Sequence, residues 1–159
     1  MSTLRETFLE ELAEVYDAEK QLVGALPKLA KAAHHEQLRR DFEEHLEQTE
    51  EQVTRLEHVF EVLGEKVEPS TCQPMLSLLT AAEAHIEHES GDAALICAAQ
   101  KVEHYEMAAY ACLQAWARLL GEEDAADLLE ETLDEEEATD ETLTETAEDI
   151  ISVEEERSS

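Results

Sequence analysis

Hydrophobic residues recur at alternating steps of three and four along most of the chain, and this spacing predicts long amphipathic α-helices. In the first half of the chain we expect one helix from Thr3 to about Ala33 and a second from about Gln37 to Leu63. The pair His34 and His35 marks the turn between them. Gly64 is suited to end the second helix, because glycine readily adopts the left-handed conformation of a helix C-cap.

The second half of the chain predicts another pair of helices. They run from Asp92 to Leu120 and from about Asp124 to Val153, with a glycine between them, and the tail EEERSS is expected to fray. Residues 65–91 hold two of the three prolines and then a shorter helical run, which indicates a long connection with one short helix. The third proline, Pro27, should kink the last turns of the first helix.

These elements predict an all-α fold of one domain, residues 1–159, with a short tail from about residue 154. The two tight turns make the helices of each pair antiparallel, whereas the long connection makes the second and third long helices run parallel. This arrangement is typical of a ferritin-like four-helix bundle with a long crossover that carries a short fifth helix.

On each of the four predicted long helices, the residues at this spacing form a stripe along the inward face. The stripe is hydrophobic at both ends and polar in the middle. Counting outward from the two tight turns places the polar positions at matching heights, so we expect them to meet near the centre of the bundle. The polar positions on or beside the inward faces are Glu19, His45, Gln48, Gln52, Glu103, Glu106, Glu136 and Asp140.

Five of these eight side chains are carboxylates, and neither Lys nor Arg lies in the stripes. Buried carboxylates must be protonated, surrounded by water or neutralised by cations, because an unpaired buried charge costs many kcal/mol. A carboxylate-rich site with an imidazole suits Fe or Mn better than Zn. The sequence therefore predicts two Fe or Mn ions, bridged by Glu106 and Glu136, with an open position for peroxide or oxygen.

A different interpretation of the same residues stays open. His45 can serve as a hydrogen-bonded core histidine, and Gln48 and Gln52 as structural amides. The chain would then be a non-catalytic bundle with a polar core, acting as a structural or interaction protein.

Charge and cysteine content narrow the partners further. The chain has 41 Asp and Glu against 11 Lys and Arg, for a net charge of −30, which argues against binding nucleic acid or an anionic membrane surface. With 43% hydrophobic residues and only four glycines it can still bury a core. Three cysteines without a CxxC motif, and no targeting or membrane-spanning segment, predict a cytoplasmic protein.

The chain also resembles the YciE/YciF group of ferritin-like proteins. The similar stretches are residues 4–33, HLEQT and RLEHVFEVLGEK, AAQKVEHYEMAAY, and LLEETLDEEEATDETLT. The resemblance implies a ferritin-like bundle, a homodimer and an association with stress responses. We also expect exposed apolar residues on the short helix to favour pairing, namely Met75, Leu78, Leu79 and Ile86.

Relatives of this group with metal centres, such as the rubrerythrins, carry a Glu on the first helix, Glu-x-x-Glu on the third, and Glu-x-x-His on the second and fourth. Glu19 matches the first motif, and Glu103 with Glu106 matches the third. The second helix departs from the pattern, with His45 and Gln48 in place of the pair and Gln52 as a further candidate. On the fourth helix Asp140 would replace the imidazole that the pattern places after Glu136.

The acidic surface predicts that salt stabilises the protein. Mutual repulsion of the exposed carboxylates is screened as the Debye length falls from about 10 Å at 0.1 M salt to about 3 Å at 1 M. We therefore expect a higher melting temperature in 2 M KCl than in dilute buffer, as for a protein adapted to a salty cytoplasm. Calorimetry at both salt concentrations checks this, and an equal or lower value in 2 M KCl would contradict it.

Overall fold

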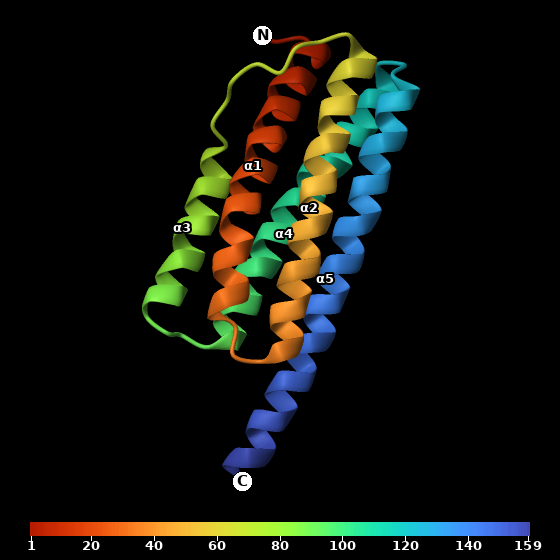
Figure 1. Ribbon diagram of the computed structural model, residues 1–159. Helices are drawn as coiled ribbons and strands as arrows, with labels where there is room; N and C mark the ends of the chain where they lie inside the picture. Colours follow the sequence, from red (N-terminus) through yellow and green to blue (C-terminus); the bar gives the residue numbers. More distant parts are fainter.

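The computed structural model describes residues 1–159 and consists of five α-helices without strands. Four long helices form a bundle, and the short α3 lies outside it against α1 and α4 (Figure 1). The predicted all-α bundle is confirmed. The helices are α1 (Leu4–Ala32), α2 (Glu36–Leu63), α3 (Gln73–Glu87), α4 (Asp92–Leu119) and α5 (Glu123–Ser158).

The order around the bundle is α1, α2, α5, α4, and each helix is antiparallel to its neighbours. The connection that contains α3 runs the full length of the bundle, so that α2 and α4 point in the same direction (Figure 1). The crossover topology predicted from the sequence is therefore confirmed.

Local signals fix several helix ends. Thr3 and Glu6 form a capping box at the start of α1, in which each side chain accepts a hydrogen bond from the other residue's backbone N–H. Gly64 ends α2 with φ 68°, and the N–H of Glu65 donates to the carbonyl of Phe60. This is the left-handed cap predicted for that glycine.

The turn between α1 and α2 is fixed from outside by Asp92, the first residue of α4. No side chain of the turn caps α2; instead the Asp92 carboxylate accepts the backbone N–H groups of His34 and His35, both at 2.8 Å. His35 Nδ1 also lies 2.6 Å from this carboxylate. Burial would raise the pKa of Asp92, but these hydrogen bonds outweigh it and lower the pKa.

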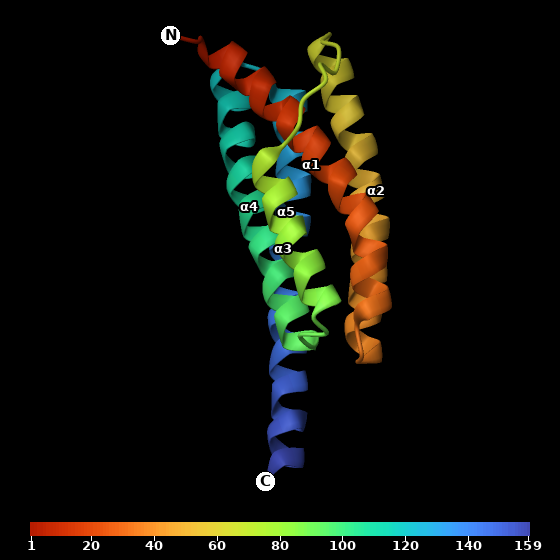
Figure 2. The same ribbon diagram turned by 90° about the vertical axis from the view of Figure 1, so that its left-hand side faces the viewer.

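Two further features concern the shape of α1 and α5. Pro27 lies inside α1, and α1 bends along its length, with its first part inclined to the bundle (Figure 2). Helix α5 continues to Ser158, five residues beyond the predicted end, and its last turns project past the other helices (Figures 1 and 2). Glutamates favour helix, so this exposed segment stays helical where the sequence analysis expected fraying.

The core consists of two apolar clusters, one toward each end of the bundle. One has 20 buried residues and surrounds Leu22, Phe42 and Val102; the other has 14 and surrounds Phe8, Leu56 and Leu113. On every long helix the polar positions of the stripe lie between the two clusters. Of the polar positions predicted on α1 and α2, Glu19, His45 and Gln52 are buried and Gln48 is half-buried.

On parts of α5 the buried position lies one residue before the apolar residue. Thr132 and Thr146 are buried, whereas the apolar residues that follow them, Leu133 and Ala147, are only half-buried. The threonines are held by hydrogen bonds, since Thr132 accepts from Arg55 at 2.9 Å and Thr146 donates to Asp41 at 2.6 Å.

The expectation of an exposed apolar face on α3 is wrong. Met75 and Leu79 are buried, and Leu78 and Ile86 are half-buried, because α3 packs this face on α1 and α4; only Leu76 is clearly exposed, at 46%. The homodimer is therefore a prediction that rests on the resemblance alone.

The cysteines and the hydropathy of the helices agree with the sequence on two points. The three cysteines form no disulfide; Cys72 is buried, and Cys97 and Cys112 are exposed on α4. None of the five helices combines the length and the apolar character that crossing a membrane requires.

Asp92→Ala should destabilise the fold, because it leaves two backbone N–H groups without their acceptor. A loss of about 1–3 kcal/mol lowers the melting temperature by roughly 3–10 °C in a chain of this size. Asp124→Ala is the matched control, since Asp124 is also in the first turn of a helix but is exposed. Equal melting temperatures for the two variants would contradict this role of Asp92.

Candidate metal centre

Between the two apolar clusters, four long helices direct five side chains of types that can bind a metal ion toward one point. All are at most 4% exposed. Glu19 comes from α1, His45 from α2, Glu103 and Glu106 from α4, and Glu136 from α5. We call these five residues the central cluster.

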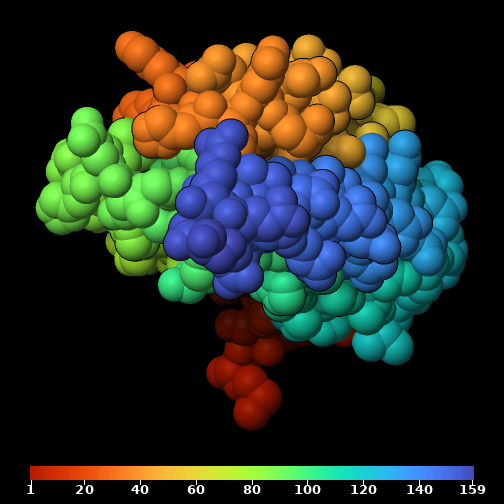
Figure 3. Space-filling model, turned by 90° about the horizontal axis from the view of Figure 1, so that it is seen from below, coloured from red at the N-terminus to blue at the C-terminus, as the bar shows by residue number.

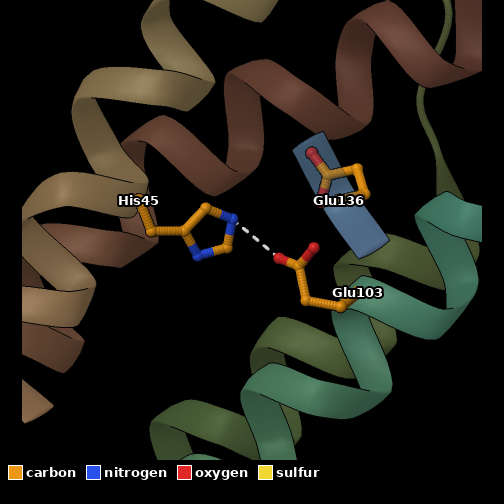
Figure 4. Close-up of side chains that lie close together, drawn as sticks. All are labelled: His45, Glu103 and Glu136. Atoms are coloured by element: carbon orange, nitrogen blue, oxygen red, sulfur yellow. Dashed lines mark ion pairs between the residues drawn. The ribbon is translucent and has the colours of Figure 1, made fainter. Parts of the chain in front are cut away.

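The central cluster has the geometry of two adjoining ligand groups. His45, Glu103 and Glu136 form one group, and Glu19, Glu106 and Glu136 form the other; within each group the ligand atoms lie within 4.8 Å of one another. Glu136 belongs to both. Figure 4 shows the first group, in which His45 Nε2 lies 2.7 Å from an Oε atom of Glu103.

The central cluster lacks the hydrogen bonds that buried polar groups normally make. Ten buried side-chain atoms of the chain have no hydrogen-bond partner, and all ten belong to the central cluster or to Gln52 beside it. They include both carboxylate oxygens of Glu103, Glu106 and Glu136. Although His45 Nε2 is close to Glu103, neither ring nitrogen is aligned for a hydrogen bond.

Burial also changes the proton affinity of these groups. It raises the pKa of Glu19 to about 7 and that of Glu103 to about 8. Burial and then the neighbouring carboxylates raise the pKa of Glu106 and Glu136 well above the ordinary value. Burial lowers the pKa of His45. Without a cation the central cluster therefore retains protons at neutral pH.

Tyr110 provides the one hydrogen bond that reaches a carboxylate of the central cluster in this geometry. Its hydroxyl donates to Glu19 Oε1 at 3.0 Å, and its ring is fully buried. Tyr110 follows Glu106 by four residues, so the two side chains share one face of α4. This helical spacing from Glu106 is the signal in the sequence that could have identified Tyr110 as a partner of the site.

The remaining predicted residues lie at the margins of the central cluster. Gln52 is buried beside Glu136; its Nε2 donates to Glu135 at 3.2 Å and its Oε1 has no partner, so an amide oxygen is available there. The Gln48 carbonyl oxygen accepts from the Thr139 hydroxyl at 2.9 Å. Gln48 thus lies in the seam between α2 and α5, outside the two ligand groups.

Asp140 lies on the other side of α5, in the seam with α4, and its side chain is 20% exposed. One carboxylate oxygen is 3.1 Å from His104 Nε2 and accepts from Gln100 at 3.4 Å. The structure therefore brings four of the five predicted carboxylates together and leaves Asp140 outside the two ligand groups.

Arg55, which is not among the predicted site residues, lies beside the site near Gln52. It pairs with Glu135, which also accepts the hydrogen bond from Gln52. Arg55 forms its ion pairs with Glu131 and Glu135 and with no carboxylate of the central cluster. Arg55 follows Gln52 by three residues on α2, and this spacing is the only signal in the sequence for its position.

Comparisons with known proteins agree with the fold. The profile of a family described as a domain of unknown function, DUF892, matches residues 3–155. Protein YciF of Escherichia coli K12 is 46% identical over an aligned length of 152, and the alignment covers 92% of each chain.

Solved structures give the same relationship. The crystal structure of the E. coli stress protein YciF superposes with a TM-score of 0.93 at 44% identity, covering 96% of this chain and 99% of that one. YcfI from Rhodopseudomonas palustris, described as a candidate structural protein, gives 0.87 at 36% identity over 90% and 94% of the two chains. A Xanthomonas campestris protein gives 0.77 at 28% identity over 98% and 99%.

The raised pKa values predict how the metal-free protein responds to pH. Carboxyls such as Glu103 keep protons that the unfolded chain releases, so their contribution to stability is lost as pH rises through their folded pKa. After treatment with a chelator, the melting temperature should fall by at least about 5 °C between pH 6 and 8.5. Calorimetry across this range measures the fall.

Glu103→Gln should make that fall shallower, since the amide does not titrate, whereas Glu50→Gln on the exposed face of α2 should not change it. A fall as steep in Glu103→Gln as in the unmodified chain would contradict the assignment.

Proposed function

The chain belongs to the DUF892 family, and we propose that it binds two divalent iron or manganese ions in the central cluster. The observation that carries this proposal is the set of ten buried, unpartnered polar atoms at one place in an otherwise satisfied core. An unsatisfied buried group costs about 1–3 kcal/mol, and more when it is charged, and bound metal ions would remove this cost for the whole set.

The charges and the spacing fit two divalent ions. Four carboxylates carry −4 when ionised, which two divalent ions would balance. Ligand atoms bonded at about 2.1 Å to a common ion lie roughly 3 Å apart, close to the 2.7 Å between His45 Nε2 and Glu103. Hydrogen bonds are not needed to satisfy these atoms if each is bonded to a metal.

Each member of the central cluster then has a role. Glu136 belongs to both ligand groups and would bridge the ions, while His45 and Glu103 complete one site and Glu19 and Glu106 the other. Gln52 Oε1 is available as a neutral ligand. Oxygen ligands with a single imidazole favour iron or manganese, since zinc sites in proteins use more His and Cys.

We further propose that the bound metal reacts with peroxide or oxygen in protection against stress. Iron or manganese in such a site supplies the redox electrons. The chain supplies the surroundings: Tyr110 holds Glu19 in place, and the apolar clusters above and below limit access of water. That YciF is described as a stress protein supports this context.

The alternative is a bundle with a structural role. The description of YcfI as a candidate structural protein supports this alternative. The raised pKa values allow a metal-free form in which the carboxyls of the central cluster share protons. Metal content separates the two possibilities.

The protein expressed in iron- or manganese-supplemented medium should contain close to two ions per chain. Glu136→Gln should lose most of the metal, because it removes the residue common to both groups, while Glu137→Gln, its exposed neighbour, should keep it. Elemental analysis measures the content, and metal removal should lower the melting temperature. Less than about 0.2 ion per chain in the unmodified protein would refute metal binding.

The reaction with oxidant is tested on the same samples. The loaded protein should accelerate the decay of peroxide relative to the chelator-treated protein. If the protein contains metal but does not accelerate peroxide decay, the proposal of metal binding stands and the proposed reaction with oxidant is refuted.

A further inference from the structure

The seam between α2 and α5 contains a cavity of about 190 Å³ close to the central cluster. These two helices lie directly side by side when the bundle is viewed from the end at which α5 projects (Figure 3). Exposed residues of both helices, including Glu44 and Thr142, line the cavity, so it reaches the surface. Its other polar lining residues are Asp41, His45, Gln48 and Thr139.

His45 is the one residue that both lines this cavity and belongs to the central cluster. Its side chain is 3% exposed, and Nε2 is the atom that approaches Glu103. The other ring nitrogen, Nδ1, is buried and has no hydrogen-bond partner. The imidazole therefore separates the cavity from the buried carboxylates, with no hydrogen bond holding its ring in place.

From this arrangement, and on the premise that the central cluster binds metal, we propose that the cavity is the path by which hydrated divalent cations reach it. A cation first binds among the polar groups of the cavity and then passes His45. The imidazole turns to admit it and returns as a ligand.

The lining of the cavity fits a hydrated cation. Asp41 and Glu44 provide carboxylates, Gln48 an amide, and two threonines hydroxyls, which are the oxygen ligands that hydrated divalent ions prefer. Asp41 is held in place because its oxygens accept hydrogen bonds from Gln37 at 2.8 Å and Thr146 at 2.6 Å. No Lys or Arg lines the cavity.

The other cavities fit the role less well. The cavity of about 550 Å³ near the end of α3 is lined by Lys28 and Lys31 and touches no residue of the central cluster. A third, apolar cavity touches His45 but has no room for water. The cavity between α2 and α5 thus combines acidic side chains, space for water and contact with a metal ligand.

The rate of metal loading tests the path. Chelator-treated protein is mixed with Co²⁺ in a stopped-flow instrument, and the absorption of bound Co²⁺ is followed; elemental analysis gives the final content. Glu44→Gln and Asp41→Asn should load about tenfold more slowly, because acidic side chains concentrate cations locally. Ala138→Trp, which fills the cavity, should also load more slowly. All three should still reach the content of the unmodified protein.

Glu47→Gln is the matched control, since Glu47 is an exposed acid on α2 that does not line the cavity. It should load at the unmodified rate. In 1 M KCl the defect of Glu44→Gln should shrink, because charge is screened, while that of Ala138→Trp should persist.

The outcomes distinguish this proposal from the one on which it rests. If the unmodified protein binds no Co²⁺, both fail. If it binds two ions and the cavity variants load as fast as it does, metal binding stands and the path is refuted. A lower final content in Glu44→Gln or Asp41→Asn would also refute the path, since these residues would then be ligands.

Discussion

The burial of four glutamates at one height of a helical bundle is the constraint on which the rest of this structure depends. Each of them lies close to at least one other carboxylate, and none forms an ion pair with a Lys or Arg; the one ion-pair contact is that of Glu103 with His45. Such an arrangement is stable only if protons or metal ions neutralise it. The bundle can tolerate the resulting cost because the two apolar clusters on either side hold the four helices together.

The connections between the helices also bring the glutamates together. The crossover with α3 makes α2 and α4 parallel, so that every neighbouring pair of long helices in the bundle is antiparallel. Asp92 fixes the turn between α1 and α2 to the start of α4, which sets the height of one helix pair relative to the other. Ligands from separate helices meet because these heights agree.

Much of this could be predicted from the chain alone. Periodicity and turn residues gave the helices and the crossover, because the stripe of apolar residues and breakers such as Gly64 are local signals. The polar middle of each stripe likewise singled out Glu19, His45 and Glu136. Side-chain partners from other helices could not be predicted in this way. Thr132 and Thr146 are buried on α5 with hydrogen bonds to α2, and packing on α1 and α4 covers the apolar face of α3.

The sequence by itself determined the all-α bundle, its acidic character and the residues from which a site could be made, since these follow from periodicity and composition. Only the tertiary structure decided which of those residues meet. It placed Asp140 and Gln48 in outer seams, brought Tyr110 to Glu19, and made His45 the boundary between a surface cavity and the buried carboxylates. The physical reason is that helical periodicity fixes a residue's face to within about one position, whereas a ligand must be placed to within a bond length.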